Sequence, residues 1–346
     1  MFEIQEALTF KSMCESSRKV AIVVHAHPDG DAMGCSCGLR AYLGAFTSAE
    51  CRIVIPDSYP DTLSFFVPEG SVIDASREQE DAFAWVTSCD LLVVMDMNRF
   101  DRASVLAPAL EQCTSPRVLI DHHLDPDRGK FSLVFSETDI SSASELTYWI
   151  LKGICPEGLP KEVLKPLLVG MTTDTNNFAN SVWPSTFTMA SEIIAAGVDR
   201  DEILSYLYNE YRENRLRALG YILSRKMEIS SDGVAYVILD AGELNSFDLQ
   251  DGETEGFVNM PLSLGKVRMS LLLKEDDGYY RVSVRSKKGV SANAYAKTFF
   301  HGGGHENASG GRLYFPGDIP GREMARDYVE QTAARFMRST APLGKN

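Results

Sequence analysis

The sequence predicts an α/β protein, with an N-terminal, mostly parallel sheet flanked by helices and a smaller C-terminal α/β domain with a mixed sheet. Short apolar runs alternate with helix-like stretches between residues 19 and 154, as in βαβ units. Polar clusters directly follow three of these runs, as at the carboxyl ends of parallel strands. Hairpin-like strands begin near residue 225. We therefore expect domains at 1–220 and 221–346.

Each element expected in the first domain has a local reason. Continuous apolar runs at 20–24, 91–95 and, within the expected strand 117–120, at 118–120 are typical of strands buried on both faces, and 51–55 is expected to be a second short strand. Helix-like patterns predict helices at 32–43, 78–88, 103–112, 142–153, 161–170, 186–196 and 199–219. Gly197 is the expected stop signal between the last two helices.

The second domain is expected to start with strands separated by turns. Strands are predicted at 234–239, 267–274 and 279–285, with the turn signal EDDG at 275–278. A helix is predicted at 291–300, a glycine loop at 302–304 and an amphipathic helix at 321–337.

Composition restricts the classes of function. The chain has 346 residues, of which 44% are hydrophobic, and a formal net charge of −14. This charge argues against binding to long duplex nucleic acid or to an anionic membrane. It does not exclude a small anionic substrate, because a metal ion and a few cationic side chains reverse the field within one cleft.

The expected location is the cytoplasm. No apolar segment reaches the roughly 20 residues of a membrane span. The N-terminus lacks the basic start and apolar core of a signal peptide. The seven cysteines form no zinc-type pair of pairs, so we expect small, buried, reduced side chains.

The strongest chemical signal follows the first expected strand. His25, Asp29 and Asp31 lie in the motif HAHPDGDAMG at 25–34, where proline and glycine indicate a loop. A loop allows these three side chains to converge on one point. Imidazole and carboxylate without a thiolate pattern suit a divalent cation such as manganese, iron, zinc or magnesium. By itself, the stretch fits a metal site and a polar turn equally well.

Polar residues also follow the later strands. Asp96 follows 91–95, and Asp121, His122 and His123 follow 117–120. Asp174 lies in a Thr/Asn-rich stretch, 172–178, that we expect to be a loop, where a lone aspartate is more often an Asx turn. All six histidines, at 25, 27, 122, 123, 301 and 305, lie in these clusters or beside the glycine loop. Structural histidines would be more scattered.

Six of these residues are candidate ligands for two divalent metal ions: His25, Asp29, Asp31, Asp96, His122 and Asp174. A hydrolytic pair of ions needs a bridging carboxylate, and Asp96 is well placed to bridge. Such a pair activates water for attack on phosphorus and neutralises charge on the phosphoryl oxygens. His27 could be a ligand, an outer partner of a ligand or only a polar residue.

With these motifs, the chain resembles the DHH phosphoesterase superfamily with a DHH-associated C-terminal domain, and most closely its nanoRNase/pAp-phosphatase branch. The resemblance rests on HAHPDGDAMG at 25–34, Asp96, IDHH at 120–123, TTDTNNF at 172–178 and VRSKKGVSANAYAKTFFHGGGHENASGG at 284–311, in the family's order.

The resemblance implies roles for the residues of the first domain. One metal ion, usually manganese, would be held by His25, Asp29 and Asp96, and a second by Asp31, Asp96, His122 and Asp174. His123 would face the scissile phosphate and assist the leaving group, and Asp121 would orient its neighbours. The resemblance therefore implies two divalent ions, with Mn²⁺ expected, and a DHH fold.

The C-terminal motif implies where the substrate's terminal phosphate or nucleotide binds. Together with His123, the matching positions are Arg285, Ser286, Gly302, Gly303, Gly304 and His305. Glycines let backbone N–H groups approach an anion closely, and arginine offers phosphate a bidentate fork. A lone glycine run is otherwise more often a flexible turn. Two points stay open: the effect of His301 in place of a glycine, and whether Arg99 or Arg102 takes the role of the family arginine after Asp96.

We therefore expect a manganese-dependent phosphoesterase that hydrolyses very short RNA and pAp (3′-phosphoadenosine 5′-phosphate). The expected partner is a short RNA or dinucleotide substrate, and a homodimer is left open. The alternatives are a stand-alone phosphodiesterase for c-di-AMP or linear pApA, a longer-strand exonuclease, an inorganic pyrophosphatase and a non-catalytic nucleotide sensor. A sensor would be expected to have lost a metal ligand, and all six positions are filled.

Overall fold

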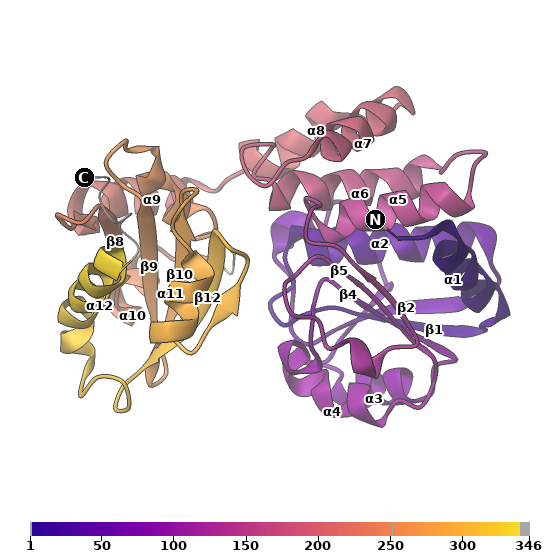
Figure 1. The fold of residues 1–346 in the computed structure, drawn as a ribbon, viewed down its shortest axis with the longest axis horizontal. Helices are drawn as coiled ribbons and strands as arrows, with labels where there is room; N and C mark the ends of the chain where they lie inside the picture. Colours follow the sequence, from indigo (N-terminus) through magenta and orange to yellow (C-terminus); the bar gives the residue numbers. More distant parts are fainter. Residues whose placement is uncertain (1, 251, 340–346) are drawn as a thin grey trace. The chain divides into compact units, whose positions relative to one another are not determined.

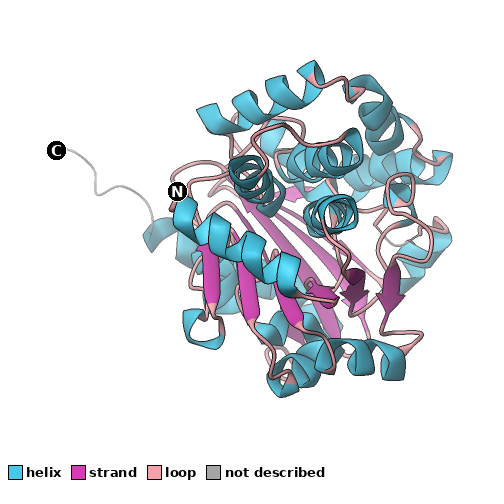
Figure 2. Cartoon of the chain, turned by 90° about the vertical axis from the view of Figure 1, so that its right-hand side faces the viewer, coloured by secondary structure: helices cyan, strands magenta, loops and turns pink. Residues whose placement is uncertain are grey.

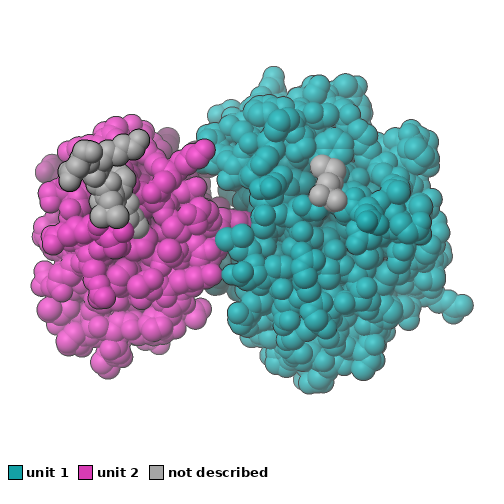
Figure 3. All heavy atoms as spheres, viewed as in Figure 1, with its two compact units in different colours: residues 1–210 teal, residues 211–346 magenta. Residues whose placement is uncertain are grey.

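The computed structural model describes residues 2–250 and 252–339 of the chain. The chain divides into two compact units, residues 1–210 (unit 1) and 211–346 (unit 2), which Figure 3 shows in different colours. The division therefore falls at Glu210/Tyr211, whereas the expected position was 220/221. The expected position lies at the end of helix α9 (Glu213–Tyr221), which belongs to unit 2.

Unit 1 is built on a six-stranded sheet in the order β3-β2-β1-β4-β5-β6, with every neighbouring pair parallel. The predicted parallel sheet is confirmed. Its strands are β1 (Lys19–Val23), β2 (Glu50–Ile55), β3 (Val72–Asp74), β4 (Leu91–Met95), β5 (Arg117–Asp121) and β6 (Leu133–Ser136). Strands β3 and β6 were not predicted, because they are short edge strands with mostly half-buried side chains and lack a continuous apolar run.

Both faces of this sheet are buried, which explains the continuous apolar runs of its central strands. Ile22 and Val93 face one core with α1 (Ile4–Ser16), α2 (Gly30–Phe46), α5 (Ala143–Ile154), α6 (Lys161–Asp174) and α7 (Pro184–Ala195). Their neighbours Val23 and Val94 face the opposite core with α3 (Gln79–Thr87) and α4 (Ala107–Gln112). Figure 1 shows the two helical layers, and Figure 2 shows the strands between them.

Two predicted helices are wrong in detail. The expected helix 103–112 is divided in two. A 3-10 helix, Phe100–Leu106, is kinked where Ser104 adopts a φ of 47°, and α4 starts only at Ala107. The expected helix 199–219 is broken. It consists of α8 (Arg200–Leu204) with a π-helical turn to Asn209, a non-helical link at 210–212, and α9. The break coincides with the division between the units.

Unit 2 has the predicted mixed sheet, in the order β11-β12-β10-β9-β8-β7. Its strands are β7 (Glu228–Ile229), β8 (Val234–Leu239), β9 (Met269–Asp276), β10 (Tyr279–Ser286), β11 (Gly303–Gly304) and β12 (Ala308–Tyr314). Strands β8 and β9 are parallel, and the other neighbours are antiparallel. Strand β12 was not predicted, because its glycines interrupt the alternation that marks a strand.

One core of unit 2 lies between this sheet and the helices α11 (Ala292–Phe299) and α12 (Ala325–Ser339), and a second, smaller one packs other residues of β8 and β9 with α9. Helix α10 (Ala241–Ser246) is short and has no buried residue. In the described part of the chain, no helix combines the length and hydropathy needed to cross a membrane. All seven cysteines are buried and free, as predicted.

Candidate active site

The candidate site lies in unit 1, at the carboxyl ends of β1, β4 and β5. His25 follows β1, Asp96 follows β4, and Asp121 ends β5 immediately before His122 and His123. Because the strands are parallel, their carboxyl ends meet at one edge of the sheet. The topology therefore brings together residues that are far apart in the sequence.

Asp29 and Asp31 are fixed by helix starts. Asp29 is the N-cap of α2, and its Oδ1 accepts hydrogen bonds from the amides of Asp31 (3.0 Å) and Ala32 (3.1 Å). Asp31 is buried, and its carboxylate accepts the amides of Ala143 (2.7 Å) and Ser144 (2.9 Å), in the first turn of α5. Helix N-termini favour negative charge, so both carboxylates are held in defined orientations.

Asp96 lies at the centre of the cluster. Its side chain is buried, its φ is 55°, and its two oxygens face different histidines. Oδ2 lies 3.3 Å from His25 Nε2, and Oδ1 lies 3.4 Å from His122 Nε2. Oδ1 is buried and accepts no hydrogen bond from any described residue. This buried oxygen faces the imidazole nitrogens of His122 and His123 without an aligned hydrogen bond, an arrangement that a bound cation would satisfy.

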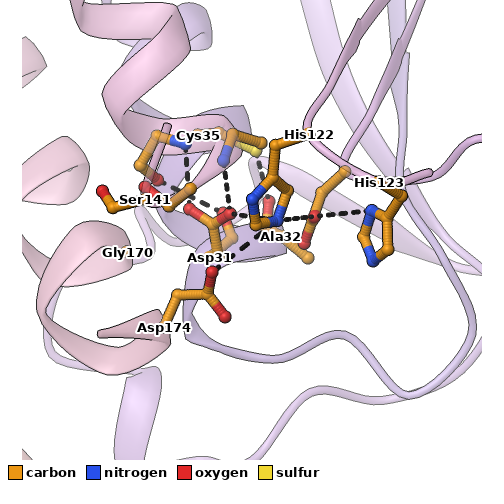
Figure 4. A network of polar contacts seen from close by, with 12 residues as sticks. Asp31, Ala32, Cys35, His122, His123, Ser141, Gly170 and Asp174 are labelled. Atoms are coloured by element: carbon orange, nitrogen blue, oxygen red, sulfur yellow. Dashed lines mark hydrogen bonds and ion pairs between the residues drawn. The ribbon is translucent and has the colours of Figure 1, made fainter. Parts of the chain in front are cut away.

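The remaining predicted ligands complete two groups that share Asp96. Ligand atoms of His25, Asp29 and Asp96 lie within 4.8 Å of one another, as do those of Asp31, Asp96 and His122. Asp174 joins the second group, with its Oδ2 3.6 Å from His122 Nε2. Figure 4 shows Asp31 and Asp174 facing His122.

Asp174 is not in a loop, as the sequence suggested, but is the last residue of α6. The threonine hydroxyls at this end of α6 donate to carbonyls of the preceding turn, Thr173 to Gly170 (2.9 Å) and the C-cap residue Thr175 to Met171 (2.8 Å). The expected loop at Asp174 was therefore wrong, and the end of a helix presents this candidate ligand.

His123 lies beside the cluster and is held by Asp121. Its Nδ1 is 2.7 Å from Asp121 Oδ1, and its backbone amide donates to Asp121 Oδ2 (3.2 Å). This carboxylate holds the imidazole, and its Nδ1 also lies 3.7 Å from Asp96 Oδ1. A carboxylate on Nδ1 fixes the tautomer of a histidine.

The crowding of buried charges shifts several pKa values. Burial lowers the pKa of His122, but Asp96, Asp174 and Asp31 outweigh it and raise the pKa to about 10. Burial and the charges of Asp96 and Asp174 raise the pKa of Asp31 well above its usual value. Burial opposes ionisation of Asp96, but its contacts with His122 and His25 hold its pKa well below the usual range. Burial lowers the pKa of His123.

These residues fit a pair of hard or borderline divalent cations. The donors are carboxylate oxygens and imidazole nitrogens, which suit manganese, magnesium, iron or zinc. The orphaned Oδ1 of Asp96 and the convergence of carboxylates on one imidazole are both relieved by bound cations.

The residues left open by the sequence differ in their surroundings. His27, with a side chain 61% exposed, pairs with Asp57 (Nδ1 to Oδ2, 3.2 Å). Arg99 pairs with Asp101 (3.1 Å). Arg102 is half-buried and has no ion-pair partner among the described residues.

Arg102 also lies close to the site. Its carbonyl accepts the amide of Ala26 (2.8 Å), and its charge acts to lower the pKa values of His25 and His123. Of the two arginines, Arg102 is therefore the one whose charge reaches the cluster.

The predicted phosphate-binding residues of unit 2 lie on adjacent strands. Arg285 on β10 pairs with Ala308 on β12, and its Nη1 donates to the carbonyl of Ser309 (3.4 Å). Gly303 and Gly304 form β11 rather than a loop and pair with Gly310 and Ser309. His305 follows in the turn, with its amide 2.8 Å from the carbonyl of Ala308.

The glycines of this segment have a packing role of their own. A Cβ at Gly302 would lie 1.9 Å from the carbonyl oxygen of Gly310, and Gly304 has a φ of 141°. Ser286 is also engaged, since its hydroxyl donates to the carbonyl of Val290 (2.6 Å). His301 Nε2 lies 2.7 Å from Asp318 Oδ1, so this histidine has a local partner in unit 2.

Sequence reasoning missed the turn that supports Asp31. The helix itself was predicted at 142–153, and α5 begins there, but the amides of Ala143 and Ser144 carry no side-chain signal that would connect them to Asp31.

Comparisons with known proteins agree with this geometry. A family model described as the DHH family, N-terminal domain, matches residues 19–171, and the DHHA1 domain model matches 232–328. The bifunctional oligoribonuclease and PAP phosphatase NrnA of Bacillus subtilis is 28% identical over 299 residues, covering 85% of this chain and 89% of the relative. The cyclic-di-AMP phosphodiesterase GdpP of Geobacillus thermodenitrificans is 25% identical over 85% of this chain, but only 44% of that protein is covered.

Among solved structures, an exopolyphosphatase-related protein from Bacteroides fragilis is 33% identical, with 98% of each chain covered and a TM-score of 0.89. The matched models divide the chain as the two units do, and the HAHPDGDAMG, IDHH and glycine motifs lie within them. The chain therefore belongs to the DHH family, with an N-terminal DHH domain followed by a DHHA1 domain.

Proposed function

We propose that this protein is a two-metal phosphoesterase that hydrolyses very short RNA and pAp. The observation that carries the proposal is the shared position of Asp96, whose two oxygens face His25 and His122 while one of them has no hydrogen-bond donor among the described residues. The similarity to a bifunctional oligoribonuclease and PAP phosphatase supports the substrate class.

We assign one ion to His25, Asp29 and Asp96, and the other to Asp31, Asp96, His122 and Asp174. Two bound divalent cations, Mn²⁺ in our proposal, would lower the pKa of water and neutralise charge on the phosphoryl oxygens. The protein's own contribution is to hold four carboxylates and two imidazoles in place with helix-start amides and strand ends. This fixed arrangement avoids reorganisation when a phosphate binds.

We assign His123 and Arg102 to the substrate. Asp121 holds His123 by Nδ1, so the ring is oriented to present Nε2 to the leaving group. Arg102 is the cation whose charge reaches the cluster without an ion-pair partner of its own in the described part of the chain. A guanidinium in this state suits a phosphoryl oxygen.

In unit 2, we assign the terminal phosphate or nucleotide to Arg285, Ser286, Gly302, Gly303, Gly304 and His305. The adjacency of Arg285 and the β11–β12 glycines supports this assignment. A single grip of this kind suits short substrates, whereas a processive nuclease needs a basic track along a long strand. The net charge of −14 agrees with the former.

The test is manganese-dependent turnover of pAp, pApA, c-di-AMP and RNA of two to ten nucleotides, measured side by side. We expect pAp and the shortest RNAs to be preferred. A preference for strands beyond about five nucleotides would contradict the short-substrate proposal.

Arg285→Gln provides a matched variant, since it leaves unit 1 unchanged. We expect it to raise KM by roughly tenfold or more through the loss of a charge-assisted hydrogen bond, with a smaller effect on kcat.

The second candidate is a stand-alone phosphodiesterase for c-di-AMP or linear pApA. The similarity to a cyclic-di-AMP phosphodiesterase over 85% of the chain favours it. Both candidates use the same metal centre, so the substrate comparison above separates them. Faster turnover of c-di-AMP than of pAp would favour the second candidate.

A further inference from the structure

One buried acidic side chain in unit 1 takes no part in the proposed chemistry. Glu145 is the third residue of α5 and is fully buried, with 0% of its surface exposed. No lysine, arginine or histidine forms an ion pair with it in the described part of the chain. Buried acids are usually paired with a cation, so this one calls for another explanation.

Glu145 is surrounded by hydrogen-bond donors. Its Oε2 accepts the amide (3.1 Å) and the hydroxyl of Ser141 and the hydroxyl of Thr186 (2.7 Å), and its Oε1 accepts the indole N–H of Trp149 (3.2 Å). The Thr186 hydroxyl itself accepts the amide of Trp183 (3.1 Å), so its proton is directed towards Glu145. The side chain therefore ties the start of α7 to the residues that precede α5.

Those residues form the turn that supports Asp31. Glu145 holds Ser141 at one end of the turn, and Ser142 caps α5 by accepting the amide of Glu145 (2.9 Å). The next two amides, of Ala143 and Ser144, donate to the Asp31 carboxylate. Figure 4 shows Ser141 near Asp31 and His122. The carboxylate of Asp31 thus rests on a turn that Glu145 fixes from behind.

A simpler explanation is that Glu145 only stabilises the helix. In an ordinary capping box, the third-residue glutamate reaches back to the N-cap amide. Here Glu145 reaches Ser141, one residue further back, and also binds Trp149 and Thr186. A helix cap needs neither full burial nor a link to a second helix. The extra contacts serve to fix the position of the turn relative to α7.

We infer that Glu145 is a positioning residue for the Asp31 side of the metal centre, acting through the turn at 141–144. The inference rests on the proposed two-metal function. It predicts that changing Glu145 weakens binding of the ion at Asp31, His122 and Asp174 much more than binding of the ion at His25 and Asp29. In the described part of the chain, the turn held by Glu145 contacts the Asp31 carboxylate directly, whereas it reaches Asp29 only through the backbone amide of Asp31. Supporting residues of this kind typically contribute 10- to 100-fold in metal affinity.

The informative variant is Glu145→Gln, which keeps the shape of the side chain. If its oxygen takes the place of Oε2, its amide group faces the indole N–H of Trp149, and two donors oppose each other. Adding Trp149→Phe removes that donor. The double variant E145Q/W149F should therefore recover part of any loss, which a purely structural defect would not do.

The experiment is Mn²⁺ titration of the full-length, metal-free protein by calorimetry, with free Mn²⁺ followed by electron paramagnetic resonance. The wild type should bind two ions. E145Q should bind one ion as the wild type does and the other roughly 10- to 100-fold more weakly, and Mn²⁺ should raise its melting temperature less. Ser142→Ala is the control for helix capping alone, because it removes the hydroxyl that accepts the Glu145 amide (2.9 Å) but leaves the four hydrogen bonds of the Glu145 carboxylate in place.

The outcomes separate the ideas. If S142A and E145Q lose the same affinity for Mn²⁺, or if E145Q binds both ions with wild-type affinity, the positioning role of Glu145 is wrong but the proposed metal centre is not affected. A wild type that binds no Mn²⁺ would overturn the proposed metal centre, and this inference with it. If E145Q does not fold, Thr186→Val removes one of the four donors. Wild-type affinity for the ion at Asp31, His122 and Asp174 in that variant would also overturn the positioning role, and a selective loss of affinity for that ion would support it.

Discussion

Replacing Asp96 by asparagine is the most direct test of the proposed centre. The substitution keeps the size of the side chain but removes the charge that faces both His25 (3.3 Å) and His122 (3.4 Å). The new side chain would also place an amide group, a donor, next to one of the imidazoles. We expect the affinity for both metal ions to fall, because Asp96 is the one residue common to both groups of ligands.

The magnitude follows from burial and from these two contacts. Removing one partner of a buried charge pair costs about 3–5 kcal/mol. In the metal-free protein at pH 7, His122 is protonated, since its pKa is raised to about 10. D96N should therefore lower the metal-free unfolding free energy by roughly 3 kcal/mol. Loss of the shared ligand should reduce kcat/KM for pAp by at least about 10³-fold, or roughly 4 kcal/mol of transition-state stabilisation.

The assay combines Mn²⁺ titration, denaturant unfolding in EDTA and turnover of pAp. Asp57→Asn is the matched control, because Asp57 also pairs with a histidine (His27, 3.2 Å) but belongs to neither ligand group. D57N should keep both ions and activity within a few-fold. The reasoning is refuted if D96N still binds two Mn²⁺ ions with near wild-type affinity, or if it hydrolyses pAp within tenfold of the wild-type rate.

Three further outcomes are expected. Arg102→Gln should lower kcat/KM by roughly 10²-fold without loss of Mn²⁺ binding, whereas Arg99→Gln should have little effect; similar rates in both would contradict the assignment of Arg102. Because the pKa of His122 rises from 6.5 to about 10 on folding, its contribution to metal-free stability is present below about pH 6.5 and is lost as the pH rises through 10. The difference in unfolding free energy between wild type and His122→Gln in EDTA should thus shrink between pH 6 and 10. A constant difference would disprove the raised pKa of His122 in the metal-free protein. Gly170→Ala would put a Cβ 2.0 Å from Ser144 Oγ, so it should destabilise the fold by about 1–3 kcal/mol, measured by denaturant unfolding; an unchanged midpoint would show that α5 can shift.

The parallel sheet was predictable because its central strands are buried on both faces. Ile22 and Val23, or Val93 and Val94, face opposite cores, so their apolar runs are continuous in the sequence. The edge strands β3 and β6 leave no such run, since half of their environment is solvent. The sequence signal for a strand therefore weakens as the burial of its side chains decreases, and it was lost at the edges of the sheet.

The candidate ligands were predictable for a different reason, namely that they follow these strands directly. The secondary structure at Asp174 was the exception, because the sequence predicted a loop there. The hydrogen bonds from the Thr173 and Thr175 hydroxyls to preceding carbonyls depend on side-chain rotamers, which composition does not reveal. The amides that hold Asp31 could not be predicted, since a backbone N–H has no residue identity. Glu145 lies more than a hundred residues from Asp31 in the sequence, and only the fold connects them.

The features that make this site costly to fold are also those that make it bind cations. Asp96 and His27 adopt positive φ values without being glycine, and Asp31 is buried beside two other carboxylates. Without a cation, the neighbouring carboxylates raise the pKa of His122, and burial together with these carboxylates raises the pKa of Asp31, so binding of a divalent ion favours release of protons. The two-sided core of the sheet supplies the stability that such a cluster lacks. The carboxylates therefore form a rigid, buried group with excess negative charge at the ends of well-packed strands. Such a group combines affinity for divalent cations with the fixed geometry that phosphoryl transfer requires.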